Sequence, residues 1–206
     1  MRGIKFFAKF VAAPVAGIAA GLVAGLLLYR SVAQTEIADR RTIASPNGIE
    51  LLVPVQIGGI EQWLSIRGKD RNAPILLYVH GGPGSPMMPL AHAFQDPLEE
   101  HFVVVQWDQR GAGKSRTGPD DLTGITIDRM IEDTIELSRH LCDRFDRDKI
   151  ILLGHSWGSV LGVNAIHRAP ELYAAYVGVG QVVNMQENEA VTYRFTLDEA
   201  KRRGDA

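Results

Sequence analysis

This 206-residue chain has one cysteine, a nearly balanced charge and no internal repeat that stands out. A single cysteine, Cys142, excludes an internal disulfide framework. The formal net charge of −2 gives no electrostatic reason to expect a nucleic-acid partner, and none is predicted. What remains is 46% hydrophobic and 22% charged, which is typical of one globular domain with a real core.

The lone cysteine lies in a segment, 126–145, whose apolar residues recur at helical spacing. Cys142 falls on this apolar stripe, so we expect a buried helix thiol rather than a nucleophile.

The first 30 residues differ in composition from the rest. Phe10 to Tyr29 carries no charge over about 20 residues, the length of a transmembrane helix. Residues 1–9 contain three basic residues, Arg2, Lys5 and Lys9. They are therefore predicted to be cytoplasmic, with the rest of the chain on the extracytoplasmic side of the bilayer. The alternative is a secreted or periplasmic protein whose signal peptide is cleaved after Ser31-Val32-Ala33.

Three glycines recur every fourth residue within this apolar segment: Gly17, Gly21 and Gly25. On a helix they share one face and let two helices approach closely, which favours a homodimer through residues 10–29. The alternative is that glycine is simply common in membrane helices.

After a polar linker at 30–45, short apolar runs alternate with helical patterns from 46 to 182. An Asn-Gly turn signal precedes an expected strand pair at 50–68. Further strands are expected near 74–80, 101–108, 149–154 and 174–180, with helices near 88–100, 126–145 and 156–169. Since near-continuous apolar strands that alternate with helices indicate a parallel sheet, the fold class is α/β. Residues 183–206 are polar and helix-prone.

A serine motif, Gly154-His155-Ser156-Trp157-Gly158, follows one buried strand and opens a helix. This context places Ser156 on a sharp strand-to-helix turn as a candidate nucleophile, with Gly154 and Gly158 shaping the turn. The Trp157 N–H would then point at a developing oxyanion. The alternative is a serine that merely caps a helix.

A glycine-rich loop, His80-Gly81-Gly82-Pro83-Gly84, follows another strand. Glycines allow backbone amides to approach a substrate, so the Gly82 N–H is the predicted second oxyanion donor. The other residues of the loop are expected to shape it: His80, Gly81, Pro83 and Gly84. His80 is expected to do so by hydrogen bonding. The alternative is an ordinary turn.

A third loop, Asp108–Ser115 (DQRGAGKS), follows the next strand, and Asp108 and Arg110 are expected to shape it. Gly113-Lys114-Ser115 invites comparison with a phosphate-binding loop, but that motif requires glycine at position 108 and a helix directly after Ser115. Neither is present, which argues against nucleotide binding.

Together the three motifs resemble the proline iminopeptidase branch of the α/β-hydrolase superfamily, in which HGGPG, DQRGxGxS and GxSWGS occur in this order. The resemblance spans about 47–180. It implies a mostly parallel α/β-hydrolase sheet, a helical cap that begins at 183–206, and hydrolysis of short peptides, amides or esters without metal or cofactor. Cap carboxylates bind the substrate amine in that branch, but three acidic residues of this region are expected on a solvated helix face instead: Glu187, Glu189 and Asp198.

A triad of this fold needs an acid and a histidine after the serine. The one later histidine, His167, lies about 16 Å along the helix that starts at Ser156, beyond hydrogen-bond reach. The resemblance places the acid and base after the cap, so we expect this chain to be truncated within the cap and to be inactive alone. The alternative is a non-catalytic, membrane-anchored protein of the same fold that binds a ligand or partner.

Overall fold

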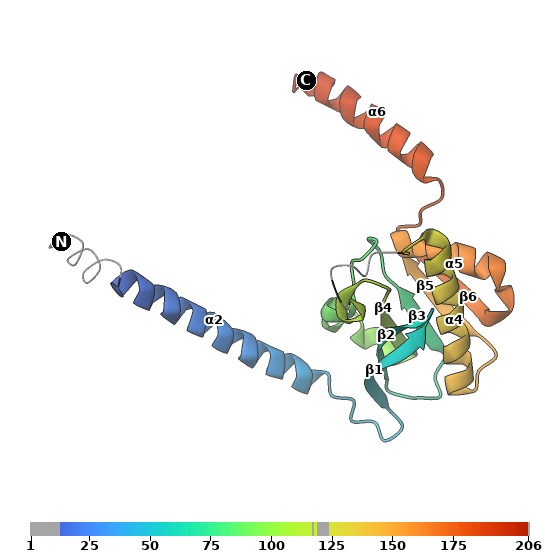
Figure 1. Ribbon diagram of the computed structural model, residues 1–206, viewed down its shortest axis with the longest axis horizontal. Helices are drawn as coiled ribbons and strands as arrows, with labels where there is room; N and C mark the ends of the chain where they lie inside the picture. Colours follow the sequence, from blue (N-terminus) through green and yellow to red (C-terminus); the bar gives the residue numbers. More distant parts are fainter. Residues whose placement is uncertain (1–12, 117, 119–123, 206) are drawn as a thin grey trace. The chain divides into compact units, whose positions relative to one another are not determined.

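The computed structural model of the chain describes residues 13–116, 118 and 124–205. They belong to two compact units, Met1–Thr42 and Ile43–Ala206. The first unit contains one long helix, α2 (Ala13–Arg40), drawn in blue in Figure 1. The predicted cytoplasmic residues 1–9, with Arg2, Lys5 and Lys9, and the start of the predicted span at 10–12 lie outside the described residues.

Helix α2 is, among the described residues, the one helix long and apolar enough to cross a membrane, over Pro14–Arg40. A signal sequence near the N-terminus would pass the same test. The helix does not end at Tyr29, where the linker was predicted to begin. Residues 30–40 are helical because this polar stretch contains neither glycine nor proline to interrupt the helix. The linker prediction assigned no secondary structure to 30–45, and the role of this stretch as a tether stays a prediction.

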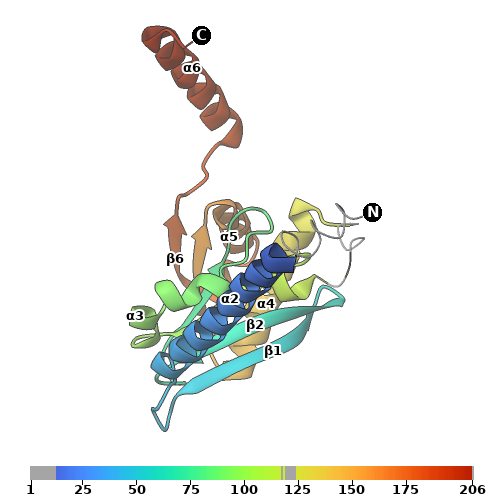
Figure 2. The same cartoon turned by 90° about the vertical axis from the view of Figure 1, so that its left-hand side faces the viewer.

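Among its described residues, the second unit contains one six-stranded sheet with the order β1-β2-β4-β3-β5-β6. Its strands are β1 (Ile49–Ile57), β2 (Ile60–Gly68), β3 (Ile75–Val79), β4 (Val103–Asp108), β5 (Ile150–His155) and β6 (Tyr173–Val179). The β1–β2 hairpin joins β4 in antiparallel fashion, whereas β4, β3, β5 and β6 are mutually parallel. Figure 2 shows the hairpin at one edge and β6 at the other. The predicted mostly parallel α/β sheet is confirmed.

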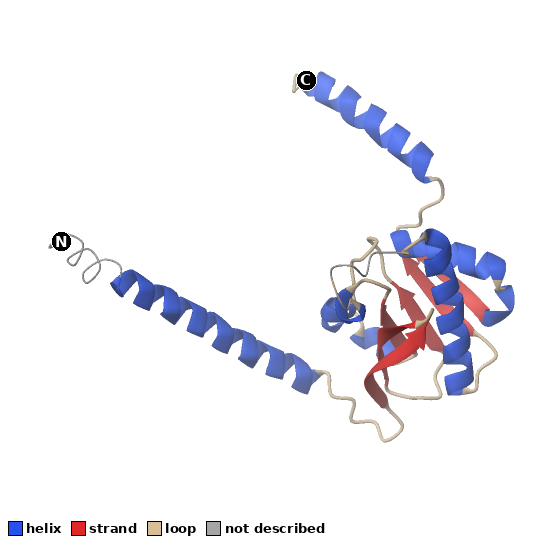
Figure 3. Ribbon diagram, viewed as in Figure 1, coloured by secondary structure: helices blue, strands red, loops and turns tan. Residues whose placement is uncertain are grey.

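Helices connect the parallel strands (Figure 3). Between β3 and β4 lie the short helices η2 (Met88–Ala93) and α3 (Asp96–Glu99), each with a proline in its first two positions, where the missing N–H costs no helical hydrogen bond. The long connections are α4 (Ile127–Phe145) and α5 (Trp157–Arg168). The chain also forms the short turns η3 (Gly113–Ser115) and η4 (Pro170–Leu172) and a last helix, α6 (Met185–Arg203).

The two faces of the sheet are packed differently. On one face, alternate strand residues such as Leu77, Val105 and Leu152 pack with α4 and α5 in the main hydrophobic core, which also buries Cys142 as expected. On the other face, Gln106 of β4 is paired with Tyr78 of β3. Its amide donates to Gln95 at 2.9 Å, so this face carries a polar layer under η2 and α3.

The central strands of the sheet are more buried than the edge strand β6. Every residue of β3 and β4 is buried, whereas most of β6 is exposed. Helix α6 begins at the N-cap Asn184, whose side chain accepts a hydrogen bond from the Glu187 N–H at 3.1 Å, and it buries no residue.

Candidate active site

Ser156 occupies the turn between β5 and α5. Its φ of 53° and ψ of −121° lie outside the regions that a residue with a side chain ordinarily adopts. Such a conformation costs about 1–3 kcal/mol, so the surrounding structure must impose it. Part of that constraint is a 2.8 Å hydrogen bond from the Ser156 N–H to the Val179 carbonyl oxygen on β6.

The two motif glycines permit close packing around this turn. A Cβ at Gly158 would lie 2.0 Å from the carbonyl oxygen of Val79 at the end of β3. A Cβ at Gly154 would lie 2.7 Å from the Gly158 carbonyl oxygen. The start of α5 therefore packs directly on backbone, as a strand-to-helix nucleophile turn requires.

The glycine-rich loop lies against the same turn. A Cβ at Gly81 would lie only 3.0 Å from the Ser156 Cβ, and Gly82 has a φ of +117° that favours glycine. Trp157 is the first residue of α5, so its N–H has no acceptor within the helix. The geometry is compatible with Gly82 and Trp157 as oxyanion donors, and this assignment stays a prediction.

His80 is fully buried behind the glycine-rich loop. Its Nδ1 lies 2.9 Å from the Gly81 carbonyl oxygen, and its Nε2 accepts the Gln109 N–H at 3.3 Å. Gln109 also donates from its side-chain amide to the His80 carbonyl oxygen at 2.9 Å. Burial lowers the pKa of His80. Because Nε2 accepts the Gln109 N–H, the ring proton is assigned to Nδ1, which donates it to the Gly81 carbonyl oxygen. These contacts connect the HGGPG loop to the DQRG loop.

Asp108 organises the third loop from the end of β4. Its carboxylate accepts the Lys114 N–H at 2.7 Å, and its carbonyl oxygen accepts the Ser115 hydroxyl. A Cβ at Gly113 would lie 2.1 Å from the Asp108 carboxylate, so the loop closes tightly around this side chain. Burial raises the pKa of Asp108. The short η3 turn at 113–115 does not continue as a helix, unlike the glycine-rich loop of a nucleotide site.

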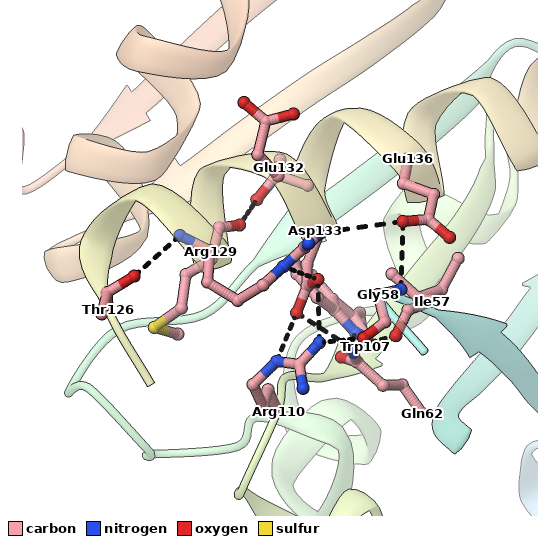
Figure 4. A network of polar contacts seen from close by, with 12 residues as sticks. Ile57, Gly58, Gln62, Trp107, Arg110, Thr126, Arg129, Glu132, Asp133 and Glu136 are labelled. Atoms are coloured by element: carbon pink, nitrogen blue, oxygen red, sulfur yellow. Dashed lines mark hydrogen bonds and ion pairs between the residues drawn. The ribbon is translucent and has the colours of Figure 1, made fainter. Parts of the chain in front are cut away.

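Arg110 fixes the same loop to α4 through Asp133, whose side chain is fully buried (Figure 4). The Arg110 Nε and Nη2 donate to the two carboxylate oxygens of Asp133 at 2.8 and 3.0 Å. Arg129 and Gln62 also donate to this carboxylate, at 2.8 and 3.0 Å. Arg110 reaches the Gly58 carbonyl oxygen as well, at 2.8 Å. Asp133 was not predicted from the sequence, although a carboxylate on the apolar stripe of a helix was a signal of a buried partner.

No described residue forms a hydrogen bond with the Ser156 hydroxyl. His167 is exposed in the last turn of α5, at the opposite end of the helix from Ser156. Within the described part of the chain, the nucleophile candidate therefore has no base partner.

A cavity of about 680 Å³ opens beside Ser156. Its walls come from the segment after β6 and from the start of α6, including Gly180, Val182, Val183 and Glu187. Glu189 and Asp198 are exposed, as expected of a solvated helix face.

The comparisons with known proteins agree with this geometry. The family described as alpha/beta hydrolase fold matches residues 74–205. The chain belongs to the α/β-hydrolase fold family. A probable aminopeptidase of Bacillus subtilis (strain 168) is 39% identical over 162 residues, covering 78% of this chain and 51% of that protein. A proline iminopeptidase of Saccharolobus solfataricus is 38% identical over 102 residues, which are 48% of this chain and 29% of that protein.

A solved structure supports the same branch of the α/β-hydrolases. The proline iminopeptidase-related protein of Thermus thermophilus superposes with a TM-score of 0.52 at 33% identity, covering 62% of this chain and 43% of that protein. The predicted membership in the proline iminopeptidase-like branch is confirmed. The chain spans about half the length of the Bacillus relative and under a third of the Saccharolobus one.

Proposed function

We propose that this α/β-hydrolase cleaves small peptide, amide or ester bonds through an acyl-enzyme on Ser156. The observation that carries the proposal is the strained backbone of Ser156 at the β5–α5 turn, with the HGGPG loop packed against it. A structural serine has no need of a conformation that costs about 1–3 kcal/mol. The relatives named aminopeptidase and proline iminopeptidase support a substrate with an N-terminal residue to release.

In the proposed reaction, the Ser156 oxygen attacks the substrate carbonyl carbon while its proton passes to a general base. The N–H groups of Gly82 and Trp157 stabilise the resulting oxyanion. Collapse of this intermediate breaks the carbon–nitrogen or carbon–oxygen bond, and the base returns its proton to the leaving group, which departs as a neutral amine or alcohol. Water then attacks the acyl-enzyme with the same base as proton acceptor, and the proton returns to the Ser156 oxygen as the acid is released. No metal or cofactor takes part in this scheme.

The base and its acid partner are the parts of this scheme that the described residues do not supply. We propose that the intact enzyme takes them from sequence outside these 206 residues. The 206-residue chain alone should then hydrolyse little, because an unassisted serine is a weak nucleophile.

We further propose that α2 anchors the enzyme in the bilayer, with residues 1–9 cytoplasmic and the hydrolase unit on the extracytoplasmic side. The support is the length and apolar composition of the helix, together with the basic residues that precede it. A homodimer through Gly17, Gly21 and Gly25 is compatible with their open surroundings, since nothing lies within 4 Å of a Cβ at any of the three.

The experiment is a hydrolysis assay on the protein expressed from its own gene in its own host membranes. Proline p-nitroanilide and p-nitrophenyl acetate serve as substrates for peptidase and esterase activity. We expect turnover that Ser156→Ala abolishes and that Ser138→Ala, a buried serine in α4, leaves intact. Turnover that survives Ser156→Ala contradicts the proposal. A wild-type protein that is folded and membrane-bound but inert on both substrates favours the binding-protein alternative.

A further inference from the structure

Ser159, the last residue of the GHSWGS motif, is fully buried and forms two hydrogen bonds with its hydroxyl group. The hydroxyl donates to the carbonyl oxygen of Ser156 at 2.6 Å. It accepts the N–H of Val182, beyond the end of β6, at 2.9 Å. A serine hydroxyl has one proton, so donation to Ser156 leaves it free to act as the acceptor for Val182.

The Val182 segment is one part of the wall of the cavity beside Ser156, and Tyr176 of β6 gives it further support. The Tyr176 hydroxyl donates to the Gln181 side-chain oxygen at 2.6 Å and lies 3.4 Å from the Ser159 carbonyl oxygen. The Gln181 amide donates in turn to the Val182 carbonyl oxygen at 2.8 Å. The Ser156 N–H holds the end of β6 at Val179, and three residues further along the Val182–Ser159 bond connects the wall residues Gly180–Val183 to the start of α5.

We infer that Ser159 is a positioning residue that fixes the cavity wall at Gly180–Val183 against the nucleophile turn. It touches no reacting atom and acts through Ser156 and Val182. The inference rests on the proposed function for its effect on substrate, but the bond itself is independent of catalysis. Because the Ser156 carbonyl oxygen also accepts the Ser159 N–H at 2.8 Å, the turn keeps a tether when the hydroxyl is removed. The wall does not.

The variant that tests this is Ser159→Ala, which removes the acceptor of the half-buried Val182 N–H. The matched control is Ser138→Ala, whose equally buried hydroxyl bonds to the Thr134 carbonyl oxygen and to the Tyr173 hydroxyl, away from Ser156. Hydrogen exchange at the Val182 amide, measured on the 206-residue chain in detergent, should accelerate about tenfold in Ser159→Ala and remain unchanged in the control. Equal exchange in the two variants overturns the inference.

A second measurement separates positioning from mere stability. In the protein expressed from its own gene, Ser159→Ala should raise KM about tenfold while kcat stays within about twofold, because the wall binds substrate and the turn remains held. A fall in kcat at constant KM overturns the positioning role. Should Ser159→Ala fail to fold, Tyr176→Phe removes the Tyr176–Gln181 bond and should shift exchange and KM in the same direction, with Tyr173→Phe as its control.

The two proposals fail separately. A wild-type protein without hydrolysis overturns the proposed function, and the exchange comparison at Val182 still decides whether Ser159 fixes the wall. Hydrolysis with unchanged Val182 exchange in Ser159→Ala overturns the Ser159 inference alone.

Discussion

The two sides of Ser156 differ in how many buried, hydrogen-bonded groups hold them in place. On one side, the HGGPG and DQRG loops are held by buried groups: His80 bonds to Gln109, and Arg110 bonds to Asp133. On the other side, the cavity wall after β6 is mostly exposed and leads into a helix that buries no residue. The side predicted to stabilise the oxyanion is therefore preorganised, whereas the side that would meet the substrate depends on few bonds.

This difference has a physical meaning for an enzyme. Donors that face developing charge work best when they are fixed in advance, since reorganisation during the reaction would cost energy. A substrate cavity must instead admit and release ligands, and segments with few buried contacts are the ones that open at low cost. Loosening each side in turn by substitution tests whether the two sides differ in this way.

The largest effect is expected from Asp133→Ala. It leaves the Arg110 guanidinium, with 12% of its side chain exposed, without its carboxylate partner. Breaking a buried pair from one side costs about 3–5 kcal/mol. Urea unfolding of the 206-residue chain in detergent, followed by tryptophan fluorescence, should show this loss. Asp128→Ala is the control, because Asp128 is 80% exposed in its pair with Arg168 and should not change the midpoint measurably.

A smaller loss of stability is expected from Gly158→Ala. Its Cβ would lie 2.0 Å from the Val79 carbonyl oxygen, which is backbone and cannot rotate away. Such overpacking costs about 1–3 kcal/mol and displaces α5 from β3. Thermal unfolding measures the change. Gly118→Ala, where a Cβ meets nothing within 4 Å, serves as the control, and equal melting temperatures in the two variants would refute the tight packing.

A pH effect is expected on the loop side. Burial lowers the pKa of His80 below the ordinary value of 6.5, so the unfolded chain takes up this proton before the folded chain does. The contribution of His80 to the free energy of unfolding is therefore lost as the pH falls below about 6.5, toward the folded-state pKa. A proton NMR titration of the His80 ring checks the direction. A midpoint at or above 6.5 would contradict a His80 pKa that is governed by burial.

The smallest effect is expected on the other side, from Phe195→Ser in α6. Phe195 is 70% exposed, so its replacement should change the free energy of unfolding of the 206-residue chain by no more than about 0.5 kcal/mol, as measured by urea unfolding. A clear destabilisation would mean that α6 packs against the sheet, which would remove the contrast between the two sides.

The elements around Ser156 could be predicted well from the sequence, because their signals are local. Apolar runs such as residues 150–154 and the stripe of α4 are strong patterns, and motif glycines mark turns wherever they fall. The position of the β1–β2 hairpin beside β4, and the Asp133 network that it completes through Gln62, could not be derived in this way. Both depend on which strands become neighbours, and this is decided by packing over long sequence separations. The helical state of residues 30–40 was not predicted, because a mixed polar composition is compatible with a helical tether and with an extended one.

The central claim is that Ser156 is the nucleophile of a hydrolase whose base lies outside these 206 residues. The most direct measurement is labelling by a fluorophosphonate probe, with the modified residue located by peptide mass spectrometry. We predict rapid labelling at Ser156 in the protein expressed from its own gene in its own membranes, and little or none in the 206-residue chain or in Ser156→Ala. Robust labelling of Ser156 in the 206-residue chain would contradict the claim that the base is missing, and labelling at another residue would contradict the nucleophile itself.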